Sequence, residues 1–437
     1  MTVSNVRIVS AAKVLLEISG FDVIRQTSLG NYVIKCGRAR ETLTIKRKCA
    51  KIFTMDELYL RYKAIAVYKS VADALTPLAE LVRADDDCAR VERAAGIFRA
   101  VEQAGVRSTG EWIERLVLCD DNPFTRAASA CARIDKRLKA QVETELLTFK
   151  QLSLLSPNDF LSDATAAFFP RFDFGGFKAN YDKLVRFHAD NGCGILACGS
   201  AFKYGAGGFG IAHIDDVRLS DLKNYDEEKA EIVKNTENFI AGLPAFHTLL
   251  YGDRGTGKST TVRALCAEYE GKLKVIELSG EDLDRLPDIF AAIRGRRQKH
   301  IIFIDDLSFD ENDRRADVFK AALEGSLDGA DNALIYCTSN RRHLIKETDR
   351  SDVRRRNDEV QAELALFDRF GLVVTYINPD KDEFIDILKQ IVRSRGLHWR
   401  DEYASIAELA ALKKGGRSPR AAKQIADLIE STYAEFI

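Results

Sequence analysis

The second half of the chain alternates short apolar runs with stretches whose apolar residues recur every three or four positions. The apolar runs cover residues 248–251, 273–278, 300–304, 333–337 and 371–377. Five buried strands separated by helical crossovers predict a parallel sheet with helices on both of its faces. After Pro379 the pattern is helical only, which predicts a small helical lid.

The first half follows the helical period instead. Apolar residues recur at helical spacing in residues 57–82, 89–104, 109–118 and 123–155, after two short strand-like runs at 31–34 and 43–45. Glycine is dense in residues 171–214, which predicts a hairpin or a small sheet. We therefore expect an α/β protein with four parts: a mostly helical N-terminal domain (1–170), a glycine-rich β linker or hairpin region (171–216), a base with a five-stranded parallel sheet (217–378) and a helical lid (379–437).

A glycine-rich loop joins the first predicted strand of the base to the helix after it. From Gly252 to Ser259 it matches the phosphate-loop pattern G-x-x-x-x-G-K-[ST]. Its glycines allow backbone N–H groups to face phosphate oxygens, and the following helix adds its positive dipole end. Lys258 would reach the β- and γ-phosphates, and Ser259 would bind Mg²⁺. The predicted ATP-binding residues are Gly252, Asp253, Arg254, Gly255, Thr256, Gly257, Lys258, Ser259 and Thr260.

Two later strands end in polar residues. The run from His300 ends in Asp305 and Asp306, and the run from Leu334 ends at Asn340. Ligands in parallel sheets bind beyond the carboxyl ends of the strands. A strand-end acid beside a phosphate loop holds Mg²⁺, so we assign Ser259 and Asp305 to the metal. Asp306 is then placed to orient or deprotonate the attacking water, and Asn340 to bond the γ-phosphate and that water.

The order of these motifs resembles that of the AAA+ ATPases, over roughly residues 217–437. In particular, the motifs are similar to those of a bacterial ATP-binding family known as domain-of-unknown-function family eight-one-five. The similar segments are 217–225, 252–259, 303–309, 338–344 and 368–372, with a shorter match at 122–126. The resemblance implies an AAA+ module, with ATP and Mg²⁺ bound between base and lid, in a ring or arc that is most often of six subunits.

The resemblance also implies roles for single residues. Asn340 would be the first sensor, and Arg369 the arginine finger that reaches a neighbouring subunit's nucleotide. Arg420 would be the second sensor on the lid, with Arg417 as the competing choice. Leu222 and Tyr225 would flank the adenine.

Two departures from many AAA+ motors qualify this picture. The Mg²⁺ strand ends in Asp305-Asp306 where they have Asp-Glu, and a side chain shorter by one methylene can slow water activation. The aromatic-Val-Gly pore loop of protein unfoldases is also absent from the sequence, since the segment after the second strand is the acidic 279–286. Both departures lower the expectation of a fast unfoldase.

Charge and composition add little about the partner. The net charge is −1, with 46% apolar and 30% charged residues, as in soluble globular proteins. Arg341-Arg342 follows the strand that ends at Asn340, and we expect it at a subunit boundary. The first seventy residues carry 13 Lys/Arg against 5 Asp/Glu, and basic clusters lie at 294–300 and 354–356. These segments permit contact with nucleic acid, although solvated basic faces are the more common explanation. The nine cysteines are scattered, and the sequence shows neither a secretion signal nor an apolar run long enough to span a membrane. These features predict a cytoplasmic protein that does not associate with membranes.

Two classes of function remain open. The first is an AAA+ ATPase that hydrolyses ATP with Mg²⁺ and remodels or loads an unidentified protein or nucleic-acid partner. The second is a nucleotide-dependent switch, adaptor or loader with little turnover, including a nucleic-acid-associated protein that uses the basic N-terminal segment.

Overall fold

The computed structural model of the chain describes three short strands near the N-terminus and most of the chain from Met55 to Ala434. The described residues are 21–26, 32–36, 42–45 and 55–434, apart from 82, 85, 170–174, 214–216, 310–312, 325–329, 341–366 and 414–415. The chain divides into two units: residues 1–120 with 135–183, and residues 121–134 with 184–437. Among the described helices, none combines the length and the apolar character needed to cross a membrane.

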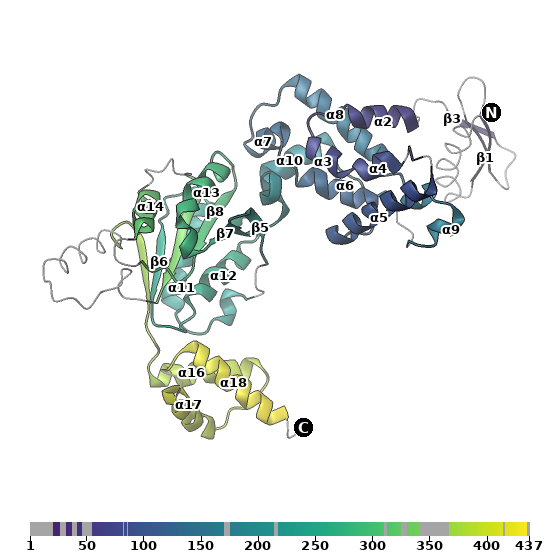
Figure 1. The fold of residues 1–437 in the computed structure, drawn as a ribbon. Coiled ribbons are helices and arrows are strands. Elements are labelled where there is room, and N and C mark those ends of the chain that lie inside the picture. Colours follow the sequence, from purple (N-terminus) through teal and green to yellow (C-terminus); the bar gives the residue numbers. More distant parts are fainter. Residues whose placement is uncertain are drawn as a thin grey trace. The chain divides into compact units, whose positions relative to one another are not determined.

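The first unit contains an antiparallel sheet and a group of helices (Figure 1). The strands are β1 (Phe21–Gln26), β2 (Tyr32–Cys36) and β3 (Thr42–Ile45), in the order β1-β2-β3. The helices are α2 (Met55–Lys63), α3 (Lys69–Ala74), α4 (Thr76–Leu81), α5 (Asp87–Ala104), α6 (Thr109–Leu118), α8 (Lys136–Leu152) and α9 (Asp163–Ala166). Helix α10 (Tyr181–Asn191) belongs to this unit up to Lys183.

The helix predicted over residues 57–82 is broken into α2, α3 and α4. The carboxylate of Glu145, which is buried on α8, accepts hydrogen bonds from the N–H groups of Ala66, Val67 and Tyr68 at 2.9–3.0 Å. These N–H groups are therefore unavailable to a helix, and Pro77 has no N–H to continue one. A long-range contact thus overrides the local pattern.

The second unit is built on a mixed seven-stranded sheet in the order β10-β6-β9-β8-β7-β4-β5. Its strands are β4 (Ala201–Gly205), β5 (Gly208–Ile211), β6 (Thr248–Gly252), β7 (Leu273–Leu278), β8 (Lys299–Ile304), β9 (Ala333–Ser339) and β10 (Leu372–Tyr376). All neighbouring pairs are parallel except β4 and β5. The predicted α/β fold with a parallel sheet is confirmed, and the β4–β5 hairpin adds two strands to the five predicted ones.

Helices cover both faces of this sheet, as Figure 1 shows. Helices α11 (Asp226–Ile240) and α12 (Lys258–Glu268) share one apolar core with Leu250 and Ile301. Helices α13 (Leu286–Ile293) and α14 (Arg314–Leu323) share the other with Leu249 and Ile302. Successive strand residues point to opposite faces, so strands buried on both sides are apolar throughout.

The last three helices, in the segment predicted to be a helical lid, pack around a core of their own. They are α16 (Lys381–Ser394), α17 (Glu402–Lys413) and α18 (Pro419–Ala434). Buried side chains from all three, among them Phe384, Ala407 and Ile425, pack together. Asp380 caps α16 and Glu383 returns the bond in a capping box, so the lid begins sharply after the last strand.

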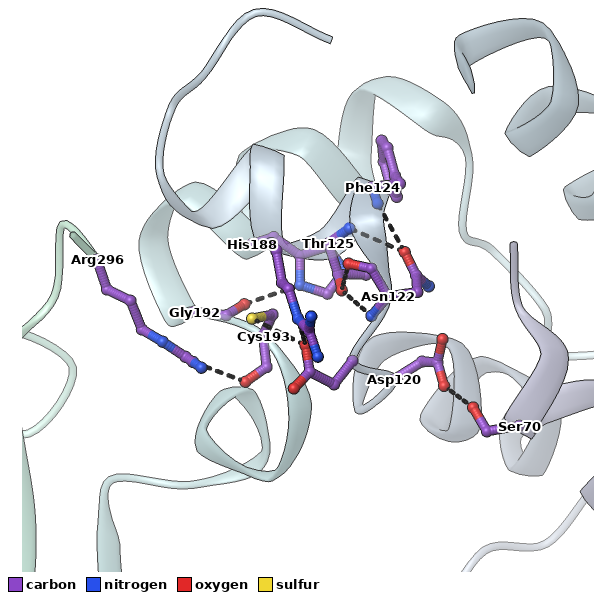
Figure 2. A network of polar contacts seen from close by, with 11 residues as sticks. Ser70, Asp120, Asn122, Phe124, Thr125, His188, Gly192, Cys193 and Arg296 are labelled. Carbon is purple, nitrogen blue, oxygen red and sulfur yellow. Dashed lines mark hydrogen bonds and ion pairs between the residues drawn. The ribbon is translucent and has the colours of Figure 1, made fainter. Parts of the chain in front are cut away.

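Helix α7 (Pro123–Ser129) lies in the second unit although α6 and α8 lie in the first. The predicted helix over 123–155 is therefore two helices. Asn122 caps α7 by accepting bonds from the N–H groups of Phe124 and Thr125 (Figure 2). Cys131 adopts a left-handed φ of 52°, which ends this helical stretch before α8 starts.

The segment before β8 holds the end of α10 in the second unit. Arg296 donates a hydrogen bond to the carbonyl oxygen of Cys193 at 3.0 Å (Figure 2). Gln298 donates one to the carbonyl oxygen of Ala189 at 2.7 Å. The Nδ1 atom of His188 lies 2.8 Å from the carbonyl oxygen of Gly192, which closes the turn after α10. The amino-terminal edge of the sheet and α10 are thereby joined by polar contacts.

Candidate nucleotide-binding site

The glycine-rich loop connects β6 to α12 at the carboxyl edge of the sheet. Gly252, Gly255 and Gly257 have positive φ angles of 133°, 81° and 98°. Glycine is required at position 252, because a Cβ atom there would lie 1.9 Å from the carbonyl oxygen of Tyr376. Gly257 precedes α12 without a side-chain cap, so N–H groups of the first helical turn are left for an anion.

Lys258, the first residue of α12, folds its buried side chain back against the backbone of this loop. Only 4% of the residue is exposed, and its Nζ donates hydrogen bonds to the carbonyl oxygens of Gly252 at 2.9 Å and Asp253 at 2.7 Å. Burial lowers the pKa of Lys258, and the carboxylates of Asp253, Asp306 and Asp305 oppose that shift. The ammonium group is thus held inside the loop that the sequence pattern predicts to bind phosphate.

The carboxylate of Asp305, just after β8, gathers three side chains from other elements. Its Oδ1 accepts hydrogen bonds from Ser259 on α12 and Thr338 on β9, each at 2.5 Å. Its Oδ2 lies 3.5 Å from the guanidinium of Arg263. Hydroxyl and carboxylate oxygens are the ligands that Mg²⁺ prefers, so Ser259 and Asp305 fit such a cation. Among the described residues, no group of three or more His, Cys, Asp or Glu could hold a metal ion.

Asp306 turns away from the strand in a left-handed conformation with φ of 53°. Its N–H donates to the hydroxyl of Thr338 at 2.9 Å, and its Oδ1 accepts from the side-chain amide of Asn340 at 2.7 Å. A non-glycine residue in this region is uncommon, although Asp and Asn tolerate it best. The two strand-end residues predicted to act on water therefore contact each other.

The lid reaches the loop through the start of α18. The N–H of Arg420 donates to the carbonyl oxygen of Gly255 at 3.1 Å. The Arg420 side chain is exposed, whereas Nε and Nη2 of Arg417 each donate to the Glu408 carboxylate at 2.8 Å. Of the two arginines that compete for the sensor position, only Arg417 is held by an ion pair within the described residues.

The residues predicted to flank the adenine lie just before α11, and Tyr225 also contacts the end of β10. Tyr225 is 8% exposed, its hydroxyl donates to the carbonyl oxygen of Ile377 at 2.8 Å, and its ring lies 4.9 Å from that of Tyr376. Burial raises the pKa of the Tyr225 hydroxyl. Leu222 is partly buried, and its carbonyl oxygen accepts a hydrogen bond from Lys229 at 2.7 Å.

The remaining predicted residues lie in three places: Arg369 away from the loop, Asp253, Arg254, Thr256 and Thr260 in the loop and the first turn of α12, and two basic clusters outside the described residues. Arg369 forms an ion pair with Glu324 at 2.6 Å and is 45% exposed. Asp253 accepts a hydrogen bond from the Asn378 N–H at 2.9 Å, Arg254 is exposed, and the Thr256 hydroxyl donates to the Asp253 carbonyl oxygen at 2.9 Å. Thr260 follows Ser259 in the first turn of α12 and is partly buried. The basic clusters at 341–342 and 354–356 lie outside the described residues.

Sequence reasoning missed Thr338, Arg263 and Asn378. Thr338 precedes Ser339 and Asn340 at a strand end, a polar signal that the sequence offered. Its side chain bonds both Asp305 and Asp306, so it sets the spacing of the two carboxylates. Arg263 stands on α12 one turn after Ser259, and only the contact across to β8 reveals its partner.

This fold and this site define a phosphate-loop nucleotide-binding protein of the AAA+ class. The strand order, the loop between β6 and α12, the strand-end acids on β8 and the lid are all present in one unit. Residues 200–433 match the model of the family described as "Protein of unknown function (DUF815)", and the chain belongs to this family.

Curated relatives are similar over part of their length. The replication factor C large subunit of Staphylothermus marinus is 25% identical over 202 residues, which cover 45% of this chain and 43% of that protein. The same subunit of Sulfolobus acidocaldarius is 40% identical over 72 residues, 16% of each chain. The ATPase family gene 2 protein of Schizosaccharomyces pombe is 29% identical over 191 residues, 40% of this chain and 21% of that protein. The chain thus spans less than half the length of these relatives.

Solved structures also match. The Thermotoga maritima RuvB Holliday junction branch migration motor is 18% identical with a TM-score of 0.36. The match covers 49% of this chain and 64% of that one.

Proposed function

We propose that this protein binds ATP with Mg²⁺ at the phosphate loop, hydrolyses it, and uses the cycle to remodel or load a partner. One observation carries the proposal: Ser259 and Thr338 meet on one oxygen of Asp305, while Asn340 contacts the neighbouring Asp306. Asp305 and Asp306 follow β8, Asn340 follows the neighbouring β9, and Ser259 stands on α12 beside them. The residues proposed to bind the metal and those proposed to activate water thus lie at one edge of the sheet.

In this proposal one set of residues binds the nucleotide and another promotes its hydrolysis. The loop from Gly252 to Thr260 would hold the phosphates, and Mg²⁺ on Ser259 and Asp305 would neutralise charge on the phosphoryl oxygens. Asp306, fixed by Asn340, would orient or deprotonate the attacking water. The exposed Arg420 would approach the nucleotide from the lid, and Leu222 and Tyr225 would flank the base.

The lid supplies the coupling in this proposal. The Arg420 N–H donates a hydrogen bond to the Gly255 carbonyl oxygen. A movement of the loop when ATP binds or is hydrolysed would therefore displace the start of α18. In this proposal residues 217–378 act as the base, 379–437 as the lid, and 1–170 hold the partner. Assembly into a ring or arc is supported by relatives that are named as a large subunit, and a replication factor's name favours nucleic acid among the partners.

A slow nucleotide-dependent switch is the second candidate. The shorter Asp306 at the position of a glutamate favours it, since its carboxylate is occupied by Asn340 at 2.7 Å. Turnover distinguishes the two candidates. Phosphate release would be measured with purified protein, with and without Mg²⁺ and with DNA or RNA added, beside a mass measurement in each nucleotide state.

We expect Mg²⁺-dependent turnover above roughly 0.01 per second, which is near the rate of an intrinsic phosphate-loop hydrolase with its arginine in place. Turnover far below that value with tight ATP binding would favour the switch. Stimulation by DNA or RNA that falls with salt would identify nucleic acid as the partner. Absence of ATP binding would remove both candidates.

Arg369→Ala should leave ATP binding intact and lower turnover about 10³-fold, because a fixed cation stabilises charge that develops on the phosphoryl oxygens. The side chain is 45% exposed and pairs with Glu324, so its loss costs little stability. Arg393→Ala, an exposed arginine on α16, is the control and should change neither quantity.

Mixing tests whether Arg369 acts between subunits. Arg369→Ala chains keep an intact phosphate loop, and Lys258→Ala chains keep an intact arginine. Mixed oligomers should therefore recover part of the turnover that each variant lacks. If no mixing ratio restores phosphate release while mass measurement shows mixed assemblies, the residue does not act on a neighbouring subunit.

A further inference from the structure

A pocket lies at the edge of the sheet opposite the phosphate loop. Three neighbouring parallel strands, β8, β7 and β4, begin there. The segments just before or at their starts line a pocket of about 450 Å³, together with Ile240 and the last turn of α10. That volume lies within the range of small-molecule sites. Nothing in the proposed nucleotide chemistry uses this pocket.

The lining of this pocket is strongly basic. Four residues with cationic side chains contribute to its lining: Lys272, Lys274, Arg297 and Lys299. The only acidic residue in the lining is Asp190, which lies 3.9 Å from Arg297. Both members of that pair are mostly exposed, so their interaction is weak. Among the described residues that line the pocket, positive charges therefore outnumber negative ones.

Lys274 is the buried member of this group. Only 8% of the residue is exposed, and its Nζ donates one hydrogen bond, to the carbonyl oxygen of Gly199 at 2.8 Å. The ammonium group also lies 5.8 Å from the centre of the Phe202 ring. No carboxylate in the described part of the chain pairs with it. Burial of a charge without an opposite charge is costly, and an ammonium group has two further donors to offer.

We propose that this pocket binds a doubly charged tetrahedral oxyanion of the phosphate type, with Lys274 as its buried cation. The oxyanion would supply the missing negative charge and accept the remaining hydrogen bonds. Lys272 and Arg297 are exposed and would meet the ligand at the pocket's mouth, and Lys299 is partly buried beside them. This inference is independent of the proposed nucleotide site.

The charged groups around Lys274 indicate how binding depends on pH. Arg296 precedes β8, and His300 is paired with Lys274 across β7 and β8. Burial, and then Arg296, lower the pKa of Lys274 to about 8. Burial lowers the pKa of His300 to about 3, so His300 stays neutral near pH 7. The other charged groups at the pocket are Lys272, Arg297, Lys299 and Asp190.

The sign of the effect follows from the lowered pKa. In the unfolded chain Lys274 has its ordinary pKa of 10.5. Below about pH 8 the side chain is protonated in both the folded and the unfolded chain, so burial of its charge lowers the free energy of unfolding by the full amount. That cost falls as the pH rises from about 8 to 10.5. A bound oxyanion stabilises the protonated form, so binding should be strongest below pH 8 and weaken above it.

Sulfate is the probe, because it has the required shape and charge and does not titrate between pH 6 and 10. The protein would be saturated with ADP and Mg²⁺ to occupy the phosphate loop. It would then be titrated with sodium sulfate in a calorimeter at constant ionic strength. We expect saturable binding at pH 7 that is several-fold weaker at pH 9.

Lys274→Met should weaken sulfate binding at least tenfold, because a charge-assisted hydrogen bond is lost. Arg297→Gln, at the exposed mouth, should weaken it several-fold. Lys423→Met, an exposed lysine on α18 of the lid, removes the same charge elsewhere and should leave binding unchanged. Removing a buried unpaired charge should keep or raise the melting temperature of Lys274→Met.

Two results would overturn the inference: no saturable sulfate binding by the wild-type protein, or equal binding by Lys274→Met and Lys423→Met. If Lys274→Met does not fold, Arg297→Gln decides the matter, and unchanged binding by that variant also overturns the inference. The test does not require ATP hydrolysis. A protein that fails the turnover assay can still show the loss in Lys274→Met, so the two proposals fail separately.

Discussion

Lys258→Ala is expected to weaken ATP binding about 100-fold or more and to abolish measurable hydrolysis. The ammonium group is buried under the phosphate loop and donates two hydrogen bonds to loop carbonyl oxygens. A triphosphate would offer charged acceptors in their place, and hydrogen bonds to charged groups contribute about 1.5–3 kcal/mol each. Two such bonds correspond to at least two factors of ten in the dissociation constant.

Binding of a fluorescent ATP analogue and release of phosphate would be measured on the same preparation. The melting temperature shows whether the loop's loss of two internal hydrogen bonds affects folding. Lys423→Ala, on the exposed side of α18, is the matched control and should behave as the wild type. Wild-type affinity and turnover in Lys258→Ala would remove this lysine, and with it the phosphate-loop assignment, from the proposal.

Asp306→Asn is expected to keep ATP binding and to lose 10²–10⁴-fold in turnover, the usual contribution of a general base. The substitution is conservative for two reasons. Asparagine tolerates the left-handed backbone at this position as well as aspartate does. Its side-chain oxygen can still accept the hydrogen bond that Asn340 now donates to Asp306. The backbone and the pair are therefore preserved, and only the proton acceptor is removed.

Single-turnover phosphate release with bound ATP separates the chemical step from binding. Asp288→Asn, an exposed acid in the first turn of α13, is the control for the same change of charge. If Asp306→Asn hydrolyses ATP at the wild-type rate, another group activates the water. If the variant loses binding instead, Asp306 acts on the loop and not on the reaction.

The central sheet could be predicted from the sequence because its strands are buried on both faces. Each such strand is a short, continuous apolar run, and each run before a helix ends at a polar or glycine-rich loop. The β4–β5 hairpin was harder to place. Its short strands contain Gly205, Gly208 and Gly210, and no local signal says that β4 pairs with β7, some seventy residues later.

In the candidate site, too, the local sequence patterns could be predicted and the contacts between distant segments could not. The phosphate loop and Asp305 are local patterns, since the required residues are consecutive. The contacts that unite them are not local: Thr338 joins Asp305 to Asp306 from another strand, and Arg420 meets Gly255 from the lid. The break between α2 and α3 also depends on a contact that is distant in the sequence. Glu145, at least 77 positions away, accepts the hydrogen bonds of the N–H groups of residues 66–68.

The loop is also fastened to the strand that leads into the lid. The N–H of Asp253 donates to Tyr376, its carboxylate accepts from the Asn378 N–H, and the Tyr225 hydroxyl donates to Ile377. Three consecutive residues of the connection are thus pinned to the base, and Pro379, with its fixed φ, comes next. We therefore expect a hinge between base and lid to begin at Pro379, with Asp253 holding the residue before it from inside the phosphate loop.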